Sequence, residues 1–218
     1  MTLHALRRSA NAADLALYRS FRSLARSPVR TRWIRRYSRL GEHGAVWLAL
    51  GAGGALVDRP RRRRWVRATA TVGGAYALST SIKLAIGRVR PVVEDLPHLM
   101  VTPTGLSFPS SHSTSSFAAA RAYGALLPTV PLYAAAGAMA ASRLYLGVHY
   151  PSDVLGGIIV GLAWSGFCMA TLEASLALAR RRAPASVVEE APAPVEHVAS
   201  VQHAATATTG ASAPSASL

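Results

Sequence analysis

The most informative absences in this 218-residue sequence concern cysteine and acidic residues. Cys168 is the only cysteine and lies in an apolar run, which excludes a disulfide framework and a cysteine-based metal cluster. Asp153 is the only acidic residue between Asp95 and Glu173, and no Cys/His/Asp/Glu cluster has metal-ligand spacing. The sequence therefore predicts no metal ion and no other cofactor.

Lysine is also nearly absent, and arginine carries the positive charge. Lysine and arginine number 24 against 10 acidic residues, which gives a net charge of +14, and Lys83 is the only lysine. Such a charge could indicate nucleic acid, but the arginines flank apolar segments and do not interleave with aromatic residues. We therefore expect an anionic membrane surface as a partner, and no nucleic acid.

Half of the residues are hydrophobic, and they are bunched, as is typical of membrane proteins. We expect residues 41–182 to form an all-α bundle with about five membrane spans, two of them weak by hydropathy. Small residues such as Gly157 and Gly161 would let these helices pack closely, with an Ala-rich genome as the alternative explanation for them. The expected spans are residues 44–57, 65–86, 113–127, 131–148 and 154–179.

The two ends of the chain differ from this central part. Residues 1–40 contain ten arginines and scattered apolar residues, but no run long enough to span a bilayer. This pattern predicts an amphipathic segment on the membrane surface, broken near Pro28, with a disordered basic arm as the alternative. Residues 183–218 are rich in Ala, Pro, Ser, Thr and Val without a pattern, so we expect a disordered tail.

A polar cluster interrupts the apolar sequence at residues 142–153. It contains Arg143, His149 and Asp153, and charges at a membrane boundary are costly unless something needs them. Pro151 fits the first turn of a helix, in which Asp153 would also lie. The carboxylate could then take the Nδ1 proton of His149 and leave Nε2 free, as base and orienting group do in nucleophilic sites. The alternative is a helix cap beside a surface histidine and arginine.

Two further stretches accompany this cluster. Residues 83–91 read KLAIGRVRP, and residues 109–112 read PSSH. In this order the three stretches resemble the signature of the type 2 phosphatidic acid phosphatase family: K-x6-R-P, P-S-[GS]-H and S-R-x5-H-x3-D. Every key position is filled, and Ser111 stands where many members have glycine. The resemblance implies the fold that this family shares with the vanadium haloperoxidases.

The residue types at these positions suit the binding of phosphate. Arg90 and Arg143 can each bind phosphate through two hydrogen bonds, and Lys83 supplies a compact point charge. Ser110 and Ser111 open an expected helix, whose free N–H groups favour an anion. The corresponding alternatives are an interfacial anchor, a chance lysine at a helix end and a plain helix cap.

The resemblance, in addition, implies catalytic roles. His149 would attack phosphorus and form a phospho-histidine, with Asp153 orienting it, while His112 would protonate the leaving alkoxide and later activate water. The implied protein is an integral membrane lipid phosphatase that needs no metal. Its substrates would be phosphatidate-like lipids or polyprenyl phosphates and diphosphates. The Arg-rich and Ala-rich chain resembles members from high-GC actinobacteria, where a phosphatase acting on decaprenylphosphoryl phosphoribose belongs to this family. That compound is therefore one candidate substrate. A lipid phosphotransferase and an inactive membrane scaffold are the alternatives.

The order of the expected spans places all three motifs on one side of the membrane, the side of the N-terminus. This agreement supports a single site. Arginines in residues 59–64 and 180–182 lie on the opposite face, which the positive-inside rule makes cytoplasmic, so the site would face outward in a multi-pass cell-membrane protein. The ten arginines in residues 1–40 favour the reverse orientation.

Overall fold

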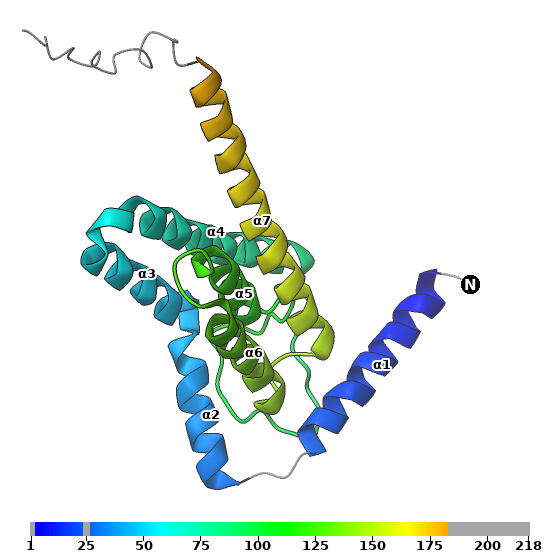
Figure 1. The fold of residues 1–218 in the computed structure, drawn as a ribbon. Helices are drawn as coiled ribbons and strands as arrows, with labels where there is room; N and C mark the ends of the chain where they lie inside the picture. Colours follow the sequence, from blue (N-terminus) through cyan, green and yellow to red (C-terminus); the bar gives the residue numbers. More distant parts are fainter. Residues whose placement is uncertain (1–2, 24–26, 183–218) are drawn as a thin grey trace, which may run out of the picture. The chain divides into compact units, whose positions relative to one another are not determined.

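The structure is a computed structural model that describes residues 3–23 and 27–182, so the predicted tail lies outside the described residues. Within these ranges the chain is helical, with no strand and one isolated bridge between Val89 and Leu106. The helices, drawn in Figure 1, are α1 (Leu3–Ser23), α2 (Pro28–Leu40), α3 (Ala45–Val57), α4 (Arg62–Ile86), α5 (Ser111–Tyr123), α6 (Thr129–Tyr145) and α7 (Pro151–Arg182), with short 3-10 turns at Glu42–Gly44 and Arg59–Arg61.

Each of the five apolar segments forms a helix, α3 to α7, with ends close to the expected limits. The helices differ in length, since α3 and α5 have 13 residues each and α4 has 25. At ~1.5 Å per residue, 13 residues reach only about 20 Å, less than the ~30 Å hydrocarbon core of a bilayer. Among the described helices, the segment Pro151–Ser175 of α7 is long and apolar enough to cross a membrane.

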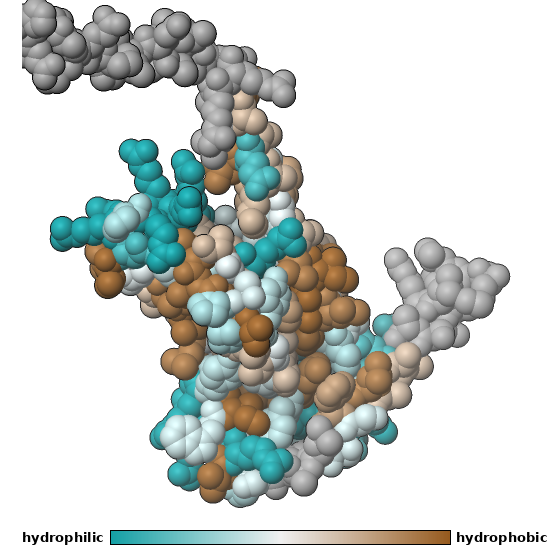
Figure 2. Space-filling view, in the orientation of Figure 1, coloured by the Kyte–Doolittle hydropathy of each residue, from teal (hydrophilic) through white to brown (hydrophobic). Residues whose placement is uncertain are grey.

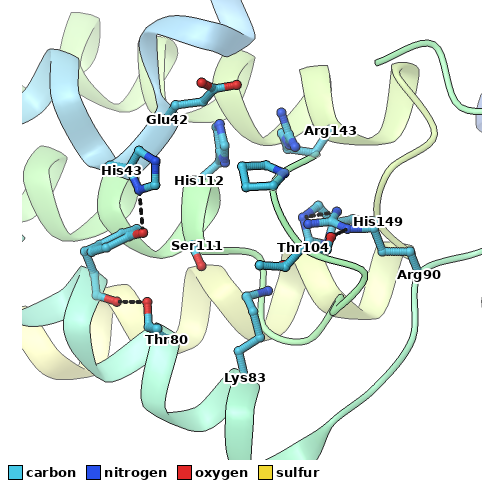
Figure 3. Close-up of a pocket in the computed structure, with 12 residues that line it drawn as sticks. Glu42, His43, Thr80, Lys83, Arg90, Thr104, Ser111, His112, Arg143 and His149 are labelled. Carbon is cyan, nitrogen blue, oxygen red and sulfur yellow. Dashed lines mark hydrogen bonds between the residues drawn. The ribbon is translucent and has the colours of Figure 1, made fainter. Parts of the chain in front are cut away.

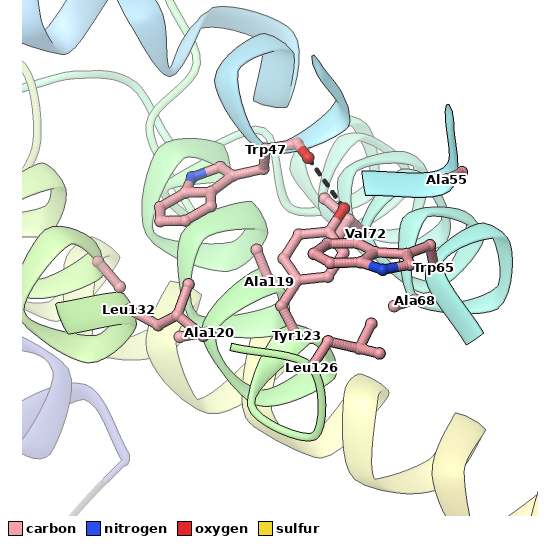
Figure 4. Close-up of a cluster of buried hydrophobic side chains, with 11 residues drawn as sticks. Trp47, Ala55, Trp65, Ala68, Val72, Ala119, Ala120, Tyr123, Leu126 and Leu132 are labelled. Atoms are coloured by element: carbon pink, nitrogen blue, oxygen red, sulfur yellow. Dashed lines mark hydrogen bonds between the residues drawn. The ribbon is translucent and has the colours of Figure 1, made fainter. Parts of the chain in front are cut away.

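Aromatic side chains form the main core, between α3, α4, α5 and α6 (Figure 4). Trp47, Trp65 and Tyr123 are buried there with Val72 and Leu132. The polar atoms of these rings are paired, because Trp47 Nε1 donates to Ser116 Oγ at 2.8 Å and Tyr123 Oη donates to the Trp47 carbonyl at 2.9 Å. The core thus buries large apolar rings without leaving these donors unsatisfied.

Close packing of α7 against α5 depends on glycine. A Cβ atom added at Gly161 would lie 2.3 Å from the Thr114 carbonyl oxygen, and one added at Gly157 would lie 2.6 Å from the Ser110 carbonyl oxygen. No side chain fits at these distances, so the predicted role of these two glycines is confirmed. The contact holds the first turns of both helices together, and these turns carry the second and third motifs.

The basic N-terminal segment is helical and packs on the other helices. Helix α1 ends at Ser23 and α2 begins at Pro28, near the predicted break, and Tyr37 on α2 donates to the Ala135 carbonyl of α6 at 2.7 Å. Tyr18 of α1 is 1% exposed, whereas Trp33 of α2 is 61% exposed. A disordered basic arm therefore does not describe residues 3–23 and 28–40. That these helices lie on a membrane surface stays a prediction.

The surface divides by polarity. Figure 2 shows hydrophobic surface along α7 and hydrophilic surface at the turn between α3 and α4. Leu155, Ile159 and Phe167 of α7 are each about 60% exposed. Exposed apolar side chains along one helix are costly in water and natural in lipid.

Candidate active site

Helix ends and loops from all three motifs meet at one cavity of about 120 Å³ (Figure 3). A water molecule needs only about 10–15 Å³ of such space, so a phosphate group has room here. The structure thereby brings together residues that lie far apart in the sequence. Side chains lining the cavity include Lys83, Arg90, Ser111, His112, Arg143 and His149.

Local chain geometry places these side chains. Lys83 and Arg143 lie in the last turns of α4 and α6, and His112 lies in the first turn of α5. His149 lies in the loop between α6 and α7, where Gly147 has a φ of 72°. A residue with a side chain is strained at this φ, and a Cβ atom there would also lie 2.7 Å from Arg22 Nε.

His149 is 1% exposed and has a partner at each ring nitrogen. Arg90 Nη1 lies 3.1 Å from its Nε2, and Ser107 Oγ lies 3.3 Å from its Nδ1. The direct hydrogen bond expected from Asp153 is not formed, because Asp153 Oδ2 is 3.6 Å from Nδ1. Ser107 instead donates its hydroxyl hydrogen to Asp153 and can accept the Nδ1 proton, so the orienting effect passes through a hydroxyl.

The remaining contacts of Asp153 explain this difference. Its Oδ2 accepts the Tyr150 N–H at 2.8 Å, which caps the start of α7. Its Oδ1 forms an ion pair with Arg88 at 2.9 Å. Arg88 also forms an ion pair with Asp14 of α1, with 2.7 Å between Arg88 Nη2 and Asp14 Oδ2. The carboxylate is therefore held by the helix cap and an ion pair, and the serine fills the remaining gap to the histidine.

The three cations of the cavity are anchored in different ways. Lys83 Nζ donates to the carbonyls of Ser107 at 3.1 Å and Pro109 at 2.8 Å, so it also supports the loop before α5. Arg90 Nε donates to the Thr104 carbonyl at 2.9 Å. Arg143 is 1% exposed, and its Nε is buried without a hydrogen-bond partner among the described residues. An unpaired buried donor at a cavity wall favours the binding of an anion.

The second motif divides between the cavity and the helix cap. His112 Nε2 lies 3.1 Å from the Ser38 carbonyl of α2, and Ser111 Oγ accepts a hydrogen bond from Ser79 at 2.8 Å. Ser110 does not line the cavity, contrary to its predicted part in substrate binding. Its Oγ caps α5 by accepting the Ser113 N–H at 3.4 Å, and its own N–H donates to the Asp153 carbonyl at 2.9 Å.

Four side chains of the site were missed by sequence reasoning. Ser38 accepts a hydrogen bond from Arg143, and Ser107 lies between His149 and Asp153. Arg88 and Asp14 hold that aspartate in place. Only Asp14 carried a usable signal, because it is the single acidic residue in the first 40 positions.

Burial lowers the pKa of His149 well below its usual value, and the nearby cations Arg90, Arg143 and Lys83 lower it further. The imidazole of the free enzyme is therefore neutral at pH 7, as a nucleophile must be. Since the folded-state pKa is depressed, the neutral form persists as the pH falls below the ordinary histidine value of about 6.5.

We predict that the acidic limb of kcat/KM lies below about pH 6.5, and that it moves to higher pH in Arg90→Gln. Removing a neighbouring cation raises the pKa of His149, so the imidazole protonates earlier as the pH falls. The measurement is the pH profile of both proteins on one substrate, which cancels the substrate's own ionisation. A limb in Arg90→Gln at the same or lower pH would contradict this account.

A helical bundle with a cationic, histidine-containing cavity at its helix ends has the design of an enzyme acting on phosphate groups. Residues 64–176 match the PAP2 superfamily, and the chain belongs to this superfamily of phosphatases. It is 45% identical over 131 residues to the decaprenylphosphoryl-5-phosphoribose phosphatase of Mycobacterium tuberculosis (strain ATCC 25618 / H37Rv), covering 57% of this chain and 70% of that protein.

Solved structures agree with this assignment. The first transmembrane PAP2-type phosphatidylglycerolphosphate phosphatase from Bacillus subtilis aligns with a TM-score of 0.62 at 25% identity, covering 76% of this chain and 87% of that one. The first bacterial vanadium-dependent iodoperoxidase aligns with a TM-score of 0.53 at 19% identity, over 63% of this chain and 43% of that one. The predicted fold, shared with the vanadium haloperoxidases, is confirmed.

Proposed function

We propose that this protein is an integral membrane phosphatase that hydrolyses a phosphomonoester or diphosphate of a lipid. The observation that carries the proposal is that three cations meet His112 and His149 at one phosphate-sized cavity. Polyprenyl phosphates are the favoured class, because a relative with 45% identity is named for decaprenylphosphoryl-5-phosphoribose. That compound is the leading candidate substrate.

In the first step, the Nε2 lone pair of His149 attacks phosphorus, and the bond between phosphorus and the leaving oxygen breaks. His112, which is protonated once the phosphate anion is bound beside it, gives its proton to that oxygen, so a phosphomonoester's product leaves as a neutral alcohol. Arg90 turns from His149 to the phosphate, and with Lys83 and Arg143 it stabilises the charge that develops on the phosphate oxygens. The distance of 3.1 Å between Arg90 Nη1 and His149 Nε2 supports this step, because it puts the guanidinium beside the proposed nucleophile.

In the second step, His112 is neutral and takes a proton from water as that water attacks the phospho-histidine. The bond between nitrogen and phosphorus breaks, inorganic phosphate leaves, and both histidines return to their starting states. The hydroxyl of Ser107 and the carboxylate of Asp153 hold the imidazole ring throughout, because both are buried behind it. All charge stabilisation in these steps comes from side chains, so the mechanism needs no metal ion.

We also propose that several helices cross the membrane and that the site faces the outside of the cell. The arginines of residues 59–64 lie at the turn between α3 and α4. If α3 and α4 each cross the membrane, this turn and the three motifs lie on opposite sides of it. Short arginine-rich loops stay in the cytoplasm. A lipid substrate could then enter the cavity while its tail remains in the bilayer.

The test is release of inorganic phosphate by the purified protein from phosphatidate, polyprenyl phosphates and decaprenylphosphoryl phosphoribose, with and without EDTA. We expect release that survives EDTA and is inhibited by vanadate, which mimics five-coordinate phosphorus. The same assay in right-side-out and inside-out vesicles tests the orientation, with faster release expected in the former. Loss of activity in EDTA, restored by a divalent cation, would contradict the metal-free mechanism, and transfer of phosphate to an added alcohol without its release would indicate a phosphotransferase.

A further inference from the structure

A second, larger cavity adjoins the catalytic one. Its volume is about 690 Å³, and its lining includes Arg35 and Arg39 of α2 and the loop from His98 to Thr102. Glu42 lines both cavities, so they are neighbours. We refer to the region lined by Arg35, Arg39, His98 and Thr102 as the outer basic pocket. None of these residues belongs to the three motifs.

The walls of the outer basic pocket are held by specific contacts. His98 Nε2 lies 2.6 Å from the Pro91 carbonyl, and the Leu99 N–H donates to the Leu146 carbonyl at 3.0 Å. Met100, in the same loop, is 7% exposed, and its Sδ lies 3.7 Å from Arg143 Nη1. The loop is therefore anchored to the end of α6 and to a cation of the catalytic cavity. The pocket therefore has anchored walls and lies next to the catalytic cavity.

The guanidinium groups of the two arginines in this pocket have N–H donors that are free to bind a ligand. Neither forms an ion pair with a carboxylate of the residues that the structure describes. The Nε of Arg35 is buried and has no hydrogen-bond partner in that part of the chain. Glu42 lies at the boundary, beside His112 and Arg143 in Figure 3, and leaves the pocket with a net positive charge. Unpaired guanidinium groups in a cavity favour an anion that can accept two hydrogen bonds from each.

We infer that the outer basic pocket binds a second anionic group of the substrate, separate from the phosphate that is cleaved. This inference rests on the proposed function and assigns a binding site to a part of the substrate that does not react. The preferred lipid carries a terminal phosphomonoester and, across a short polar spacer, a phosphodiester that links it to the tail. The terminal phosphate enters the catalytic cavity, and the phosphodiester binds Arg35 and Arg39.

Helix α2 is well placed to make this distinction. One side of α2 supplies Ser38, which contacts Arg143 and His112 in the catalytic cavity. The positions of Arg35 and Arg39, one turn apart, supply the pocket beside it. Helix α2 lies outside residues 64–176, the part that matches the superfamily. The chemistry is thus in the shared region, and the recognition of the second anion is in a segment of its own.

The experiment compares two water-dispersible lipids with the same dioctanoyl tail in neutral detergent micelles. Phosphatidate has one phosphate, whereas phosphatidylglycerol phosphate has a terminal phosphomonoester and a phosphodiester. The test variant is Arg35→Gln/Arg39→Gln. The matched control is Arg32→Gln/Arg36→Gln, which removes two charges from the same helix at exposed positions that do not line the pocket. Neutral micelles remove any general attraction of α2 to an anionic surface.

We expect the test variant to lose about 10–100-fold in kcat/KM on phosphatidylglycerol phosphate, the range for lost charge-assisted hydrogen bonds. Its kcat/KM on phosphatidate should be unchanged, and the control should match the unmodified protein on both lipids. Equal losses on both lipids, no loss on either, or the same selective loss in the control would overturn the inference while leaving the phosphatase intact. If the unmodified protein released no phosphate from either lipid, nor from decaprenylphosphoryl phosphoribose or a polyprenyl phosphate in the same micelles, the proposed function would be overturned, and the inference with it.

Discussion

Replacing His149 with alanine should abolish the phospho-enzyme on every substrate and lower kcat on the order of 10⁴–10⁶-fold, as removal of a catalytic nucleophile does. In the proposed mechanism His149 is the group through which the covalent step passes, and the other two histidines that line the cavity, His43 and His112, do not bond to phosphorus. The residual rate would come from the cations that still bind and polarise the phosphate.

The measurement is acid-quenched labelling of the protein with a radioactive lipid phosphate, together with steady-state phosphate release. His43→Ala provides a matched control, because His43 lines the same cavity but its Nδ1 is 2.7 Å from the Tyr76 hydroxyl and it belongs to no motif. The control should still form the phospho-enzyme. A labelled protein in His149→Ala, with an unlabelled His43→Ala, would show that His149 is not the nucleophile.

The composition of the catalytic cavity could be predicted from the sequence because its residue types are constrained by the chemistry. A phosphate group needs cations, a nucleophile and an acid, and these are rare within apolar segments unless they have a function. Arg143 and His149 were predicted in this way, whereas Lys83, Arg90 and His112 were predicted from the resemblance to the phosphatase family signature, and all five line the cavity. The helices could also be predicted from the sequence, since runs of apolar residues with glycine and proline at their ends indicate them.

The supporting residues could not be predicted, because they depend on which elements meet in space. Asp14 and Ser152 are 138 residues apart in the sequence and yet hydrogen-bonded, at 3.0 Å between the Ser152 N–H and the carboxylate. Ser38 reaches Arg143 across 105 residues. No local pattern specifies such contacts. The different positions of Ser110 and Ser111, one at the helix cap and one at the cavity, could not be predicted either. Serine is favoured at a helix start both as a cap and as a phosphate ligand, so the residue type does not distinguish the two roles.

The N-terminal helices show how packing can change the meaning of a sequence pattern. The arginines of residues 1–40 predict a surface segment, and several of them are exposed as expected. Arg22, however, is 1% exposed and donates to the Tyr145 carbonyl at 2.9 Å and the Pro97 carbonyl at 2.5 Å. Charge and hydrophobicity do not distinguish Arg22 from the neighbouring arginines. Arg22 is buried because it lies on the face of α1 that meets the loop before His149.

The role of His112 can be separated from that of His149 by the leaving group. If His112 is the general acid, His112→Ala should slow release of the first alcohol by about 10²–10⁴-fold when the substrate is an alkyl phosphate. An alkoxide is a poor leaving group and needs a proton as the bond breaks. An activated aryl phosphate leaves as a stable phenolate without one, so the first turnover on that substrate should be close to that of the unmodified protein.

Later turnovers should nevertheless be slow on both substrates, because in the proposed mechanism His112 also activates the water that attacks the phospho-histidine. The predicted signature of His112→Ala is therefore a burst of phenol, about one per enzyme, followed by slow release and an accumulated phospho-enzyme. Rapid-mixing measurements of phenol release and acid-quenched labelling test both parts. If the first turnover of His112→Ala were slowed equally on alkyl and aryl phosphates, His112 would act by binding phosphate and not by transferring a proton. Its ring, held by the contact between Nε2 and the Ser38 carbonyl, would then serve to position the phosphate.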